Sequence, residues 1–397
     1  MPKTEGRRLI ILVLGAGVSG IAAARGLLRD GHDVKVFDQR PNVTVGGGAV
    51  TIWSNGAAVL QQLGVEMDGA GQVLSSARVM TSTGRPLPTM DLDAMATRLG
   101  APIRMVPRRV LLERLLAGFP TDRIRCSSRA VAVIGNRDGV RVDFADGSSA
   151  HGDLLVGADG LHSVVRRIAG APPAEPTGWY SWQGLATVAG IAEPHVATMM
   201  IGEHGNLGIW PAGGSDMQWW FDLPWSPGFV RPYRPIDMIR SHFSGWSDMV
   251  DEVLATLTDD HLAPSQFPHF RHPIPGAGAG RLTLLGDAAH TMPPTLAQGT
   301  NQALLDAMVL RKSLRDKEIS NGDIGNALRW YENTRRRKVK AVSWLTTLQV
   351  SRSEAVLRPA ALIPDRVMTW ALMRFFAWVS HCGISSEMRS DSCAEMR

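Results

Sequence analysis

The chain has 397 residues, of which 44% are hydrophobic and 20% charged, and this composition is typical of a globular enzyme. Its formal net charge is +5, but the basic residues are scattered apart from one run at 335–340, which we interpret as a solvated helix face. The sequence has neither zinc-finger spacing nor an aromatic–basic RNA-binding pattern, so we expect no nucleic-acid partner.

The first predicted elements are a strand, a glycine-rich turn, a helix and a second strand. Residues 9–14 (LIILVL) are rich in branched apolar side chains, which is typical of a strand buried on both faces of a parallel sheet. A G-x-G-x-x-G motif follows at residues 15–20. A helix at 21–28 and a strand at 33–37 come next, and the strand ends at Asp38.

Each part of this unit has a physical role in binding a dinucleotide. Gly15 permits a tight turn, Gly17 has no Cβ and lets a pyrophosphate approach the backbone, and Gly20 lets the helix pack closely on the strand. The helix N-terminus offers unpaired N–H groups to the phosphates, and Asp38 can accept hydrogen bonds from ribose hydroxyls. The unit therefore predicts dinucleotide binding, but it does not distinguish NAD from FAD.

Two later segments also join a buried strand to a turn. Residues 153–167 (DLLVGADGLHSVVRR) predict a strand that ends in Asp159-Gly160 and is followed by a helix. Residues 281–307 (RLTLLGDAAHTMPPTLAQGTNQALLDA) predict a strand that runs into Gly286-Asp287. A loop with proline and glycine comes next, and a helix begins near Gly299.

With these segments the chain resembles the group A flavoprotein monooxygenases, the family of para-hydroxybenzoate hydroxylase. That family carries GxGxxG near its start, a DG motif in mid-chain and a later GDAAHxxxPxxxxGxN motif, and all three stand here in that order. Residues 46–50 with Asn55 resemble its flavin-side loop, and Arg108 resembles its flavin-contacting arginine. Trp182-Gln183-Gly184 and Trp210-Pro211 resemble landmarks of its substrate sheet.

The resemblance spans roughly residues 9–345 and implies an α/β fold. A Rossmann-type FAD-binding domain would carry an inserted, mainly-β substrate domain and a C-terminal helical tail. The expected ranges are 1–71, 101–175 and 273–345 for the FAD-binding domain, 72–100 and 176–272 for the substrate-binding sheet, and 346–397 for the C-terminal helical region. This tail would cap the substrate side or pack against a second subunit.

The resemblance also implies roles around the flavin. Asp287 would bind the ribityl hydroxyls, Pro294 would lie beside the reactive C4a edge of the isoalloxazine ring, and backbone N–H groups of residues 296–301 would hold its pyrimidine end. The positive end of the helix that begins there would stabilise reduced, anionic flavin. Asp159 would help to bind both FAD and the nicotinamide cofactor. The expected cofactor-binding residues are Gly15, Ala16, Gly17, Val18, Ser19, Gly20, Asp38, Gln39, Arg40, Gly47, Gly48, Ala49, Val50, Arg108, Asp159, Gly286, Asp287, Pro294, Ala297, Gln298, Gly299, Thr300 and Asn301.

Four positions, at three places in the chain, depart from the family pattern. Ala297 stands where the family often has a second glycine, so it would tighten the flavin loop. Asp38-Gln39 replaces the usual Glu-Arg at the end of the second strand, and the shorter acid should still reach a ribose. Gln183 stands where many relatives have an arginine, and this argues against a simple aromatic acid as the substrate.

The resemblance implies that NADH or NADPH reduces FAD. The reduced flavin then takes up O₂ as a C4a-hydroperoxide and transfers oxygen to an electron-rich carbon. We expect substrate contacts from the sheet at 176–272, with Trp182, Gln183, Trp210 and Trp220 as candidates. This region is rich in large aromatic rings, which favours an apolar pocket for an aromatic or polycyclic small molecule.

No side-chain base can be chosen, because four histidines qualify only by residue type: His204, His269, His272 and His290. Hydroxylation and epoxidation are not distinguished. Two non-oxygenating chemistries on the same fold also stay open, namely reduction of a prenyl chain and cyclisation or stabilisation of an intermediate without redox turnover. A third alternative is an NAD-dependent dehydrogenase, against which the DG and GDAAH segments argue.

The apolar stretch at 367–379 is too short to span a membrane and carries Arg374, so we expect a packing helix and no membrane contact. The three cysteines, at positions 126, 382 and 393, lie far apart without a CxxC motif. This usage argues against a disulfide framework or a zinc site and favours a cytoplasmic setting. The choice between monomer and homodimer stays open.

Overall fold

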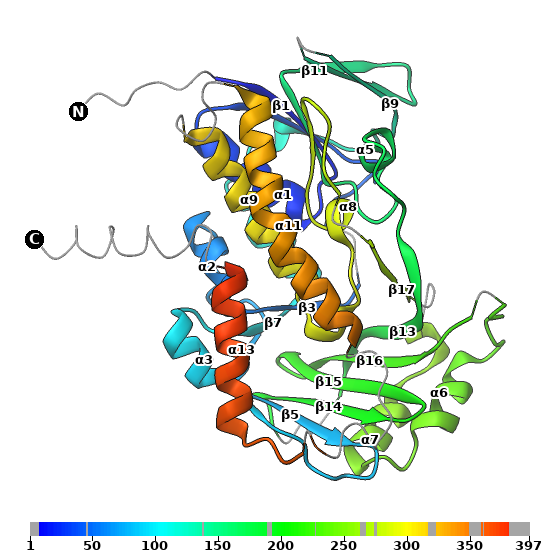
Figure 1. Ribbon diagram of the computed structural model, residues 1–397. Coiled ribbons are helices and arrows are strands. Elements are labelled where there is room, and N and C mark those ends of the chain that lie inside the picture. Colours follow the sequence, from blue (N-terminus) through cyan, green and yellow to red (C-terminus); the bar gives the residue numbers. More distant parts are fainter. Residues whose placement is uncertain are drawn as a thin grey trace, which may run out of the picture.

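The computed structural model has two packed regions (Figure 1). One is built on a parallel sheet with helices against it, and the other on a larger, mainly antiparallel sheet. This architecture confirms the expected α/β fold with a mainly-β second region. The described residues are 8–44, 47–136, 139–188, 193–226, 228–262, 267–273, 276–316, 323–348, 359 and 361–380.

A five-stranded parallel sheet forms the centre of the first region. Its strands are, in spatial order, β18 (Leu282–Leu284), β12 (Leu154–Gly157), β1 (Ile10–Leu14), β2 (Asp33–Phe37) and β8 (Ile124–Arg125). Ile11, Leu12 and Val13 have no exposed surface, as expected for a central strand that is covered on both faces. Because the strands are parallel, the segments that follow β1, β2, β12 and β18 all begin at the same edge of the sheet.

Helices cover this sheet and join its distant segments. They are α1 (Val18–Arg29), α2 (Ser54–Gln62), α4 (Arg108–Leu116), α5 (Val164–Ile168), α8 (Asp287–His290), α9 (Gly299–Arg315) and α11 (Ile324–Leu348). α1 packs along α9, and Ile21 and Leu27 share a buried core with Leu304 and Leu310. The end of α1 is tied to α9 because the Arg311 guanidinium donates to Asp30 at 2.6 and 2.8 Å.

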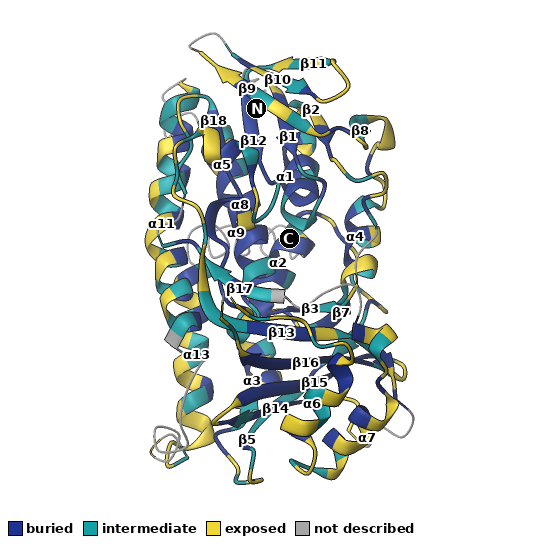
Figure 2. Cartoon of the chain, turned by 90° about the vertical axis from the view of Figure 1, so that its right-hand side faces the viewer, coloured by how far each residue is buried: buried dark blue, intermediate teal, exposed yellow. Residues whose placement is uncertain are grey.

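A seven-stranded sheet forms the second region, and only its β14–β5 pairing is parallel among those of the described strands. Its strands are, in spatial order, β17 (Phe267–Arg271), β13 (Glu175–Thr187), β16 (Asp216–Pro224), β15 (Gly205–Gly213), β14 (Val196–Gly202), β5 (Ser76–Thr81) and β6 (Met90–Asp91). The sheet lies beneath the first region, and β16 and β15 are largely buried (Figure 2).

Strand alternation gives this sheet two different faces. Trp182, Trp219 and Phe221 belong to a buried cluster with the apolar sides of α6 (Pro235–Phe243) and α7 (Asp248–Thr256). These helices cover the outer face. Trp220 belongs to the opposite face, which is directed toward the first region and shares a cluster with Trp53.

The remaining described strands form two smaller sheets. One comprises β3 (Ala49–Ile52), β7 (Arg104–Pro107) and β4 (Gln72–Val73), and the other β9 (Ala130–Gly135), β10 (Val140–Phe144) and β11 (Ser149–Gly152). β4 falls in the range 72–100 that was expected to join the substrate sheet, yet it pairs with β7. The division of the chain into domain ranges otherwise stays a prediction.

The C-terminal helix α13 (Asp365–Ser380) lies on the substrate-sheet side, against β6 and α3 (Leu92–Leu99). Backbone N–H groups of Thr89 and Asp91 donate to the side chains of Asp365 and Thr369 at 2.9 and 3.1 Å. The described part of the tail therefore caps this region. Cys382, Cys393 and the rest of the expected tail after residue 380 lie outside the described residues. Within the described ranges, no helix is both long and apolar enough to cross a membrane.

Candidate functional site

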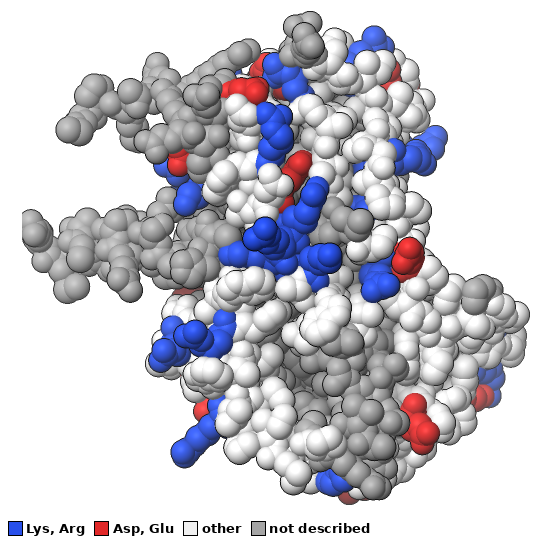
Figure 3. Space-filling view, viewed as in Figure 1, with Lys and Arg blue, Asp and Glu red and all other residues white. Residues whose placement is uncertain are grey.

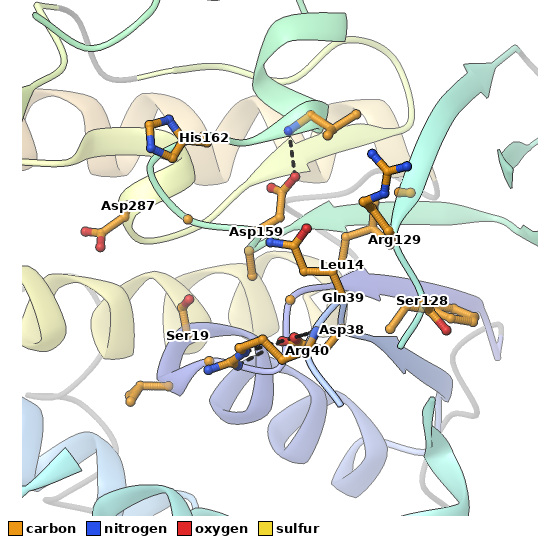
Figure 4. Close-up of a pocket in the computed structure, with 18 of the residues that line it drawn as sticks. Leu14, Ser19, Asp38, Gln39, Arg40, Ser128, Arg129, Asp159, His162 and Asp287 are labelled. Carbon is orange, nitrogen blue, oxygen red and sulfur yellow. Dashed lines mark hydrogen bonds and ion pairs between the residues drawn. The ribbon is translucent and has the colours of Figure 1, made fainter. Parts of the chain in front are cut away.

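A cavity of about 550 Å³ opens where β1, β2 and β12 end and where α1 and α9 begin (Figure 4). Its lining contains residues from all three motifs: Gly15, Gly17, Val18, Ser19, Asp38, Gln39, Arg40, Arg108, Asp159, Asp287, Gly299 and Thr300. The other expected cofactor-binding residues do not line it: Ala16, Gly20, Gly47, Gly48, Ala49, Val50, Gly286, Pro294, Ala297, Gln298 and Asn301. The fold thus brings the three motifs to one site, although they are more than 100 residues apart in the chain.

The glycine-rich turn is tight at two glycines and open at the third. Gly15 has a φ of 101°, and a Cβ there would lie 2.2 Å from the Ala158 carbonyl oxygen. A Cβ on Gly20 would lie 1.9 Å from the Gly15 carbonyl oxygen. Around the corresponding position on Gly17 nothing lies within 4 Å, so a ligand can approach the backbone from that side.

Two helices present N-termini to the cavity without side-chain caps. The N-cap residues are Gly17 for α1 and Gln298 for α9, and no side-chain hydrogen bond caps either helix. The amide N–H groups of the first turns, which include those of Ser19 and Thr300, lack acceptors within their own helices. Together with the partial positive charge of each helix end, they favour a ligand that carries anionic groups.

Asp38 is almost fully engaged within the protein. The Ala16 N–H donates to Oδ2 at 2.7 Å, and the backbone N–H and guanidinium of Arg40 donate at 2.8 to 2.9 Å. Burial favours a higher pKa for Asp38, but these donors hold its pKa below the ordinary value. Since a carboxylate accepts about four hydrogen bonds, a ribose hydroxyl would compete with Arg40 for this group. Contact between Asp38 and a ribose therefore stays a prediction.

Asp159 and Asp287 differ in how free their carboxylates are. Asp159 accepts from the Ser163 hydroxyl at 2.5 Å and from the Val164 N–H at 2.7 Å, so it orders the start of α5, and burial raises its pKa. Asp287 is exposed at the cavity, and Figure 4 shows it apart from the other labelled carboxylates. Of these two acids, Asp287 is the one available to a ligand hydroxyl.

A buried ion-pair cluster holds the segment after β18 in place. Asp306 on α9 accepts from the Gly286 N–H at 2.9 Å, lies 2.5 Å from His290 Nε2 and accepts from Arg335 Nε at 2.7 Å. Burial opposes ionisation of Asp306, but His290 and Arg335 lower its pKa. His290 is therefore structural in this arrangement. Arg166 is structural too, since its Nη1 donates to the carbonyls of Ala288 and Ala289 at 3.1 and 2.9 Å.

This cluster corrects one expectation from the sequence. The basic run at 335–340 was interpreted as a solvated helix face, but Arg335 is 4% exposed because it turns inward to Asp306. Arg336, Arg337 and Lys340 are exposed as expected. Lys and Arg gather over the middle of the face along which α11 runs (Figure 3).

The expected flavin loop is anchored by Asn301. Its Nδ2 donates to the carbonyls of Ala297 and Thr51 at 2.8 and 2.9 Å, and its Oδ1 accepts from the Trp53 N–H at 2.9 Å. Ala297 has φ 49° and ψ 35°, the left-handed conformation that glycine adopts more easily. Asn301 thus ties the loop to β3 and α2.

The four expected substrate residues do not lie together. Gln183 is exposed, and Trp220 and Trp210 lie on the same sheet face with ring centroids 5.6 Å apart. Trp182 is 1% exposed on the other face, under α6 and α7, with the Arg231 guanidinium 5.1 Å from its ring centroid. The expectation for Trp182 is therefore corrected, because adjacent strand residues point to opposite faces.

Several polar residues near the site had not been expected. Gln218 accepts from the Ala49 N–H at 2.5 Å and so joins the substrate sheet to residues 47–50, the expected flavin-side loop. Asp306 accepts from the Gly286 N–H, Gln302 donates to the Gln298 side chain at the start of α9, and Asp222 lies on the same sheet face as Trp220. Nothing in a single sequence marks their distant partners: Gln218 accepts from a backbone N–H 169 residues away, and Gln302 accepts from Arg335, 33 residues away.

The residues at the cavity suit an extended dinucleotide such as FAD. The open side of Gly17, the two uncapped helix N-termini and the free Asp287 carboxylate would meet phosphates, an electron-rich ring and hydroxyl groups. Among the described residues, no group of three or more His, Cys, Asp or Glu could hold a metal ion.

Comparisons with known proteins agree with this fit. A family model described as "FAD binding domain" matches residues 8–345. The chain is 31% identical over 338 residues to an FAD-dependent urate hydroxylase of Klebsiella oxytoca, covering 83% of this chain and 86% of that protein. It is 30% identical over 355 residues to a 3-amino-4-hydroxybenzoate 2-monooxygenase of Streptomyces platensis, covering 86% and 88%. A Klebsiella pneumoniae protein solved with FAD and uric acid superposes with a TM-score of 0.83 at 26% identity, covering 94% and 97%.

Proposed function

This chain belongs to the group A FAD-dependent aromatic hydroxylases, and we propose that it oxygenates an aromatic or polycyclic small molecule with NAD(P)H and O₂. It is a flavin monooxygenase with FAD as its cofactor. The observation that carries the proposal is the cavity at which residues of all three motifs meet two uncapped helix N-termini. In this proposal, residues of the second region determine which substrate the enzyme binds.

In this proposal the chain holds FAD along the cavity. Residues 15–20 would bind the pyrophosphate through the α1 N-terminus, and Asp287 would bind the ribityl hydroxyls. Residues 296–301 would hold the pyrimidine end of the ring with backbone N–H groups, and Pro294 and Arg108 would contact its other edges. The uncapped N-terminus of α9 supports this orientation, because it favours negative charge on the ring.

Bound FAD, once reduced by NAD(P)H, would supply from O₂ the electrophilic oxygen atom that the substrate receives. The protein must orient the substrate against the ring and exclude water. Gln183, Trp210 and Trp220 would form the wall that does so. Gln183 is exposed and Trp220 half-buried on the sheet face directed toward the first region, which leaves them accessible to a ligand.

We propose a fused-ring or heteroaromatic substrate. The wall contributes the indole rings of Trp210 and Trp220 and the neutral carboxamide of Gln183. Because position 183 is not an arginine, it offers no cation to pair with a substrate carboxylate. The named activities of the relatives, on urate and on an aminohydroxybenzoate, are consistent with an aromatic substrate. The cytoplasmic setting expected from cysteine usage and the oligomeric state stay predictions.

The experiment is stopped-flow flavin absorbance of the FAD-loaded protein with NADH and NADPH, with and without a panel of fused-ring aromatics. We expect one class of aromatic to accelerate flavin reduction under nitrogen, and O₂ uptake to match product formation in air. Gln183→Ala should weaken the acceleration at least about tenfold, whereas Trp182→Phe, on the opposite face, should leave it unchanged.

Two outcomes would favour the alternatives. A flavin that neither nicotinamide reduces would point to non-redox cyclisation or stabilisation. Reduction of the flavin with hydrogenation of a prenyl chain and no O₂ uptake would point to a reductase. If small benzoates alone accelerated reduction, the fused-ring substrate class would be wrong while the monooxygenase function stood.

A further inference from the structure

The C-terminal helix α13 has one side that packs and one that is exposed. Phe376 and Val379 are buried against the body of the protein. On the other side Val367, Trp370 and Trp378 are 50%, 59% and 47% exposed. These three positions lie within about 80° of one another around a helix with about 3.6 residues per turn. They therefore form one exposed apolar face.

Much of the exposed apolar surface of the described chain is gathered at this face. The chain has 12 tryptophans, and the three that are exposed are Trp370 and Trp378 on α13 and Trp344 on α11. Trp344 is 62% exposed, and α11 contacts α13. Leu362 and Ile363, which precede α13, are 83% and 37% exposed. A single apolar side chain at a surface needs no explanation, but a group of this kind marks a face that meets a partner.

Basic side chains border the apolar face. Those that are exposed on the two helices include Arg336, Arg337 and Lys340 on α11 and Arg366 and Arg374 on α13. The Arg374 guanidinium lies 5.9 Å from the centroid of the Trp370 ring. Trp344 follows Lys340 by about one helical turn. Lys and Arg gather where α11 crosses the side of the molecule on which α13 also lies (Figures 1 and 3).

Acidic side chains do not balance these cations. From residue 333 to its end α11 carries no acid, and the one acid of α13 is Asp365. Asp365 and Asp91, which stand at the start of α13 and before α3, each accept a backbone N–H, at 2.9 and 2.8 Å. The neighbouring helix α3 adds one exposed acid and one exposed cation, Asp93 and Arg98. The face therefore combines apolar side chains with an excess of positive charge.

This combination selects the kind of partner. A second copy that docked through the same face would bring Arg366 and Arg374 toward their own counterparts, without enough acids to pair with them. An anionic phospholipid surface complements both properties. Tryptophan rings are favoured at the level of the headgroups, aliphatic side chains enter the acyl boundary, and Lys and Arg are attracted to the anionic headgroups.

We propose that α13 and the adjoining end of α11 form a docking surface for an anionic phospholipid membrane, on which the protein lies without crossing it. Trp344, Trp370 and Trp378 enter the boundary between headgroups and acyl chains, and the cations beside them meet the phosphates. The stretch at 367–379 was expected to be a packing helix without membrane contact. It does pack through one face, and the proposal departs from the second part of that expectation because the other face is exposed and apolar.

The test is co-sedimentation of the full-length, FAD-loaded protein with vesicles, and flavin absorbance in the pellet gives the bound fraction. One vesicle type is phosphatidylcholine alone, and the other is phosphatidylcholine and phosphatidylglycerol in equal parts. The variants are Trp370→Ser/Trp378→Ser and Arg336→Gln/Arg337→Gln. The matched control is Tyr233→Ser/Arg234→Gln, which removes an exposed ring and an exposed arginine beside α6, away from α13 (Figure 1).

We expect the wild type to bind the anionic vesicles at least about tenfold more tightly than the neutral ones. Rising salt should weaken this binding, because it screens the headgroup charge. Each of the two variants should lose at least about tenfold in affinity for the anionic vesicles, and the control should bind like the wild type. Retained flavin shows that a variant is folded, and if one variant does not retain it the other carries the test.

Three outcomes overturn the proposal. The first is equal binding of the wild type to both vesicle types, and the second is a control that loses as much affinity as the two variants. The third is a wild-type dimer in solution that Trp370→Ser/Trp378→Ser converts into a monomer, which would assign the face to a second copy. The readout needs neither NAD(P)H nor a substrate, so it does not depend on the proposed oxygenation.

Discussion

Ala297 is a residue in a conformation that suits glycine. Its φ of 49° places the Cβ close to the following backbone, which costs an L-residue roughly 1 kcal/mol. We expect Ala297→Gly to raise the free energy of unfolding by roughly 0.5 kcal/mol. The strain relieved by removal of the Cβ is larger than the entropy that glycine adds to the unfolded chain. Urea denaturation measures the change.

The control is the same chemical change inside a helix. Ala307→Gly in α9 should lower the free energy of unfolding by about 1 kcal/mol or more, because its conformation is already helical and its methyl group is buried. If both variants were destabilised alike, the methyl group of Ala297 would be contributing packing that outweighs its backbone strain.

Arg335 and Arg336 are neighbours with different surroundings, so they form a matched pair. Arg335→Gln removes a buried partner of Asp306, and we expect it to lower the free energy of unfolding by about 3 kcal/mol or more, because the Asp306 carboxylate is left undercompensated. Arg336→Gln should change it by less than about 0.5 kcal/mol, since that side chain is exposed. Equal effects in chemical denaturation would contradict the buried ion pair.

At the scale of elements, one aromatic contact joins α13 to the start of α2, close to the loop at 296–301. Phe376 is 2% exposed and packs on Trp53, with ring centroids 4.9 Å apart. The backbone N–H of Trp53 in turn donates to Asn301 Oδ1 at 2.9 Å. The C-terminal helix is therefore connected, through two contacts, to the loop proposed to hold the flavin.

We expect Phe376→Ala to lower the free energy of unfolding by about 3 kcal/mol, because it leaves a cavity between α13 and Trp53. Trp378→Ala on the same helix is the control, since Trp378 is 47% exposed, and its effect should stay below about 1 kcal/mol. Thermal unfolding of the FAD-loaded protein compares the two. A Phe376 variant as stable as the control would show that α13 contributes little to the fold.

Other elements follow from local chemistry alone. The branched residues of β1 and the uncapped glycine turn after it form the expected strand and helix N-terminus, since both depend on neighbours within a few residues. β4 differs, because the two residues Gln72 and Val73 pair with β7 at a distance that no local pattern encodes.

For the whole molecule, two buried histidines make stability depend on pH. Burial, with further contributions from Arg166 and His290, lowers the pKa of His272 to about 3, and burial lowers that of His269 to about 4. An unfolded histidine titrates near about 6.5. Below that pH the unfolded chain binds protons that the folded chain does not, so stability falls as the pH drops toward 4.

Asp222 acts with the opposite sign. Its pKa is raised from 3.8 to about 7, so between these values the folded chain binds the extra proton, and this stabilisation is lost as the pH rises. Of these three groups, the two histidines outweigh the one acid, so together they contribute a loss of stability as the pH falls from 6 to 4.

His272→Asn isolates one of these groups. The Asn Oδ1 can still accept from the Thr291 N–H, which His272 Nδ1 now accepts at 3.0 Å, but it does not titrate. We expect the slope of unfolding free energy against pH between 6 and 4 to decrease by up to about 1.4 kcal/mol per pH unit. Urea denaturation across that range measures it. An unchanged slope would mean that His272 does not stay neutral in the folded state.

The sequence by itself determined the features that short-range chemistry controls. The three motifs, their order, the strand-to-turn units and the membership of the family were all readable, because each depends on residues within one local segment.

Only the tertiary structure decided what each polar side chain meets. It turned Arg335 inward to Asp306 and covered Trp182 with α6 and α7. It also aligned Ser181, Asp222 and His269 from three strands into one buried row. These outcomes depend on which face of a sheet or helix is covered by a segment far away in the chain, and residue spacing carries no information about that partner.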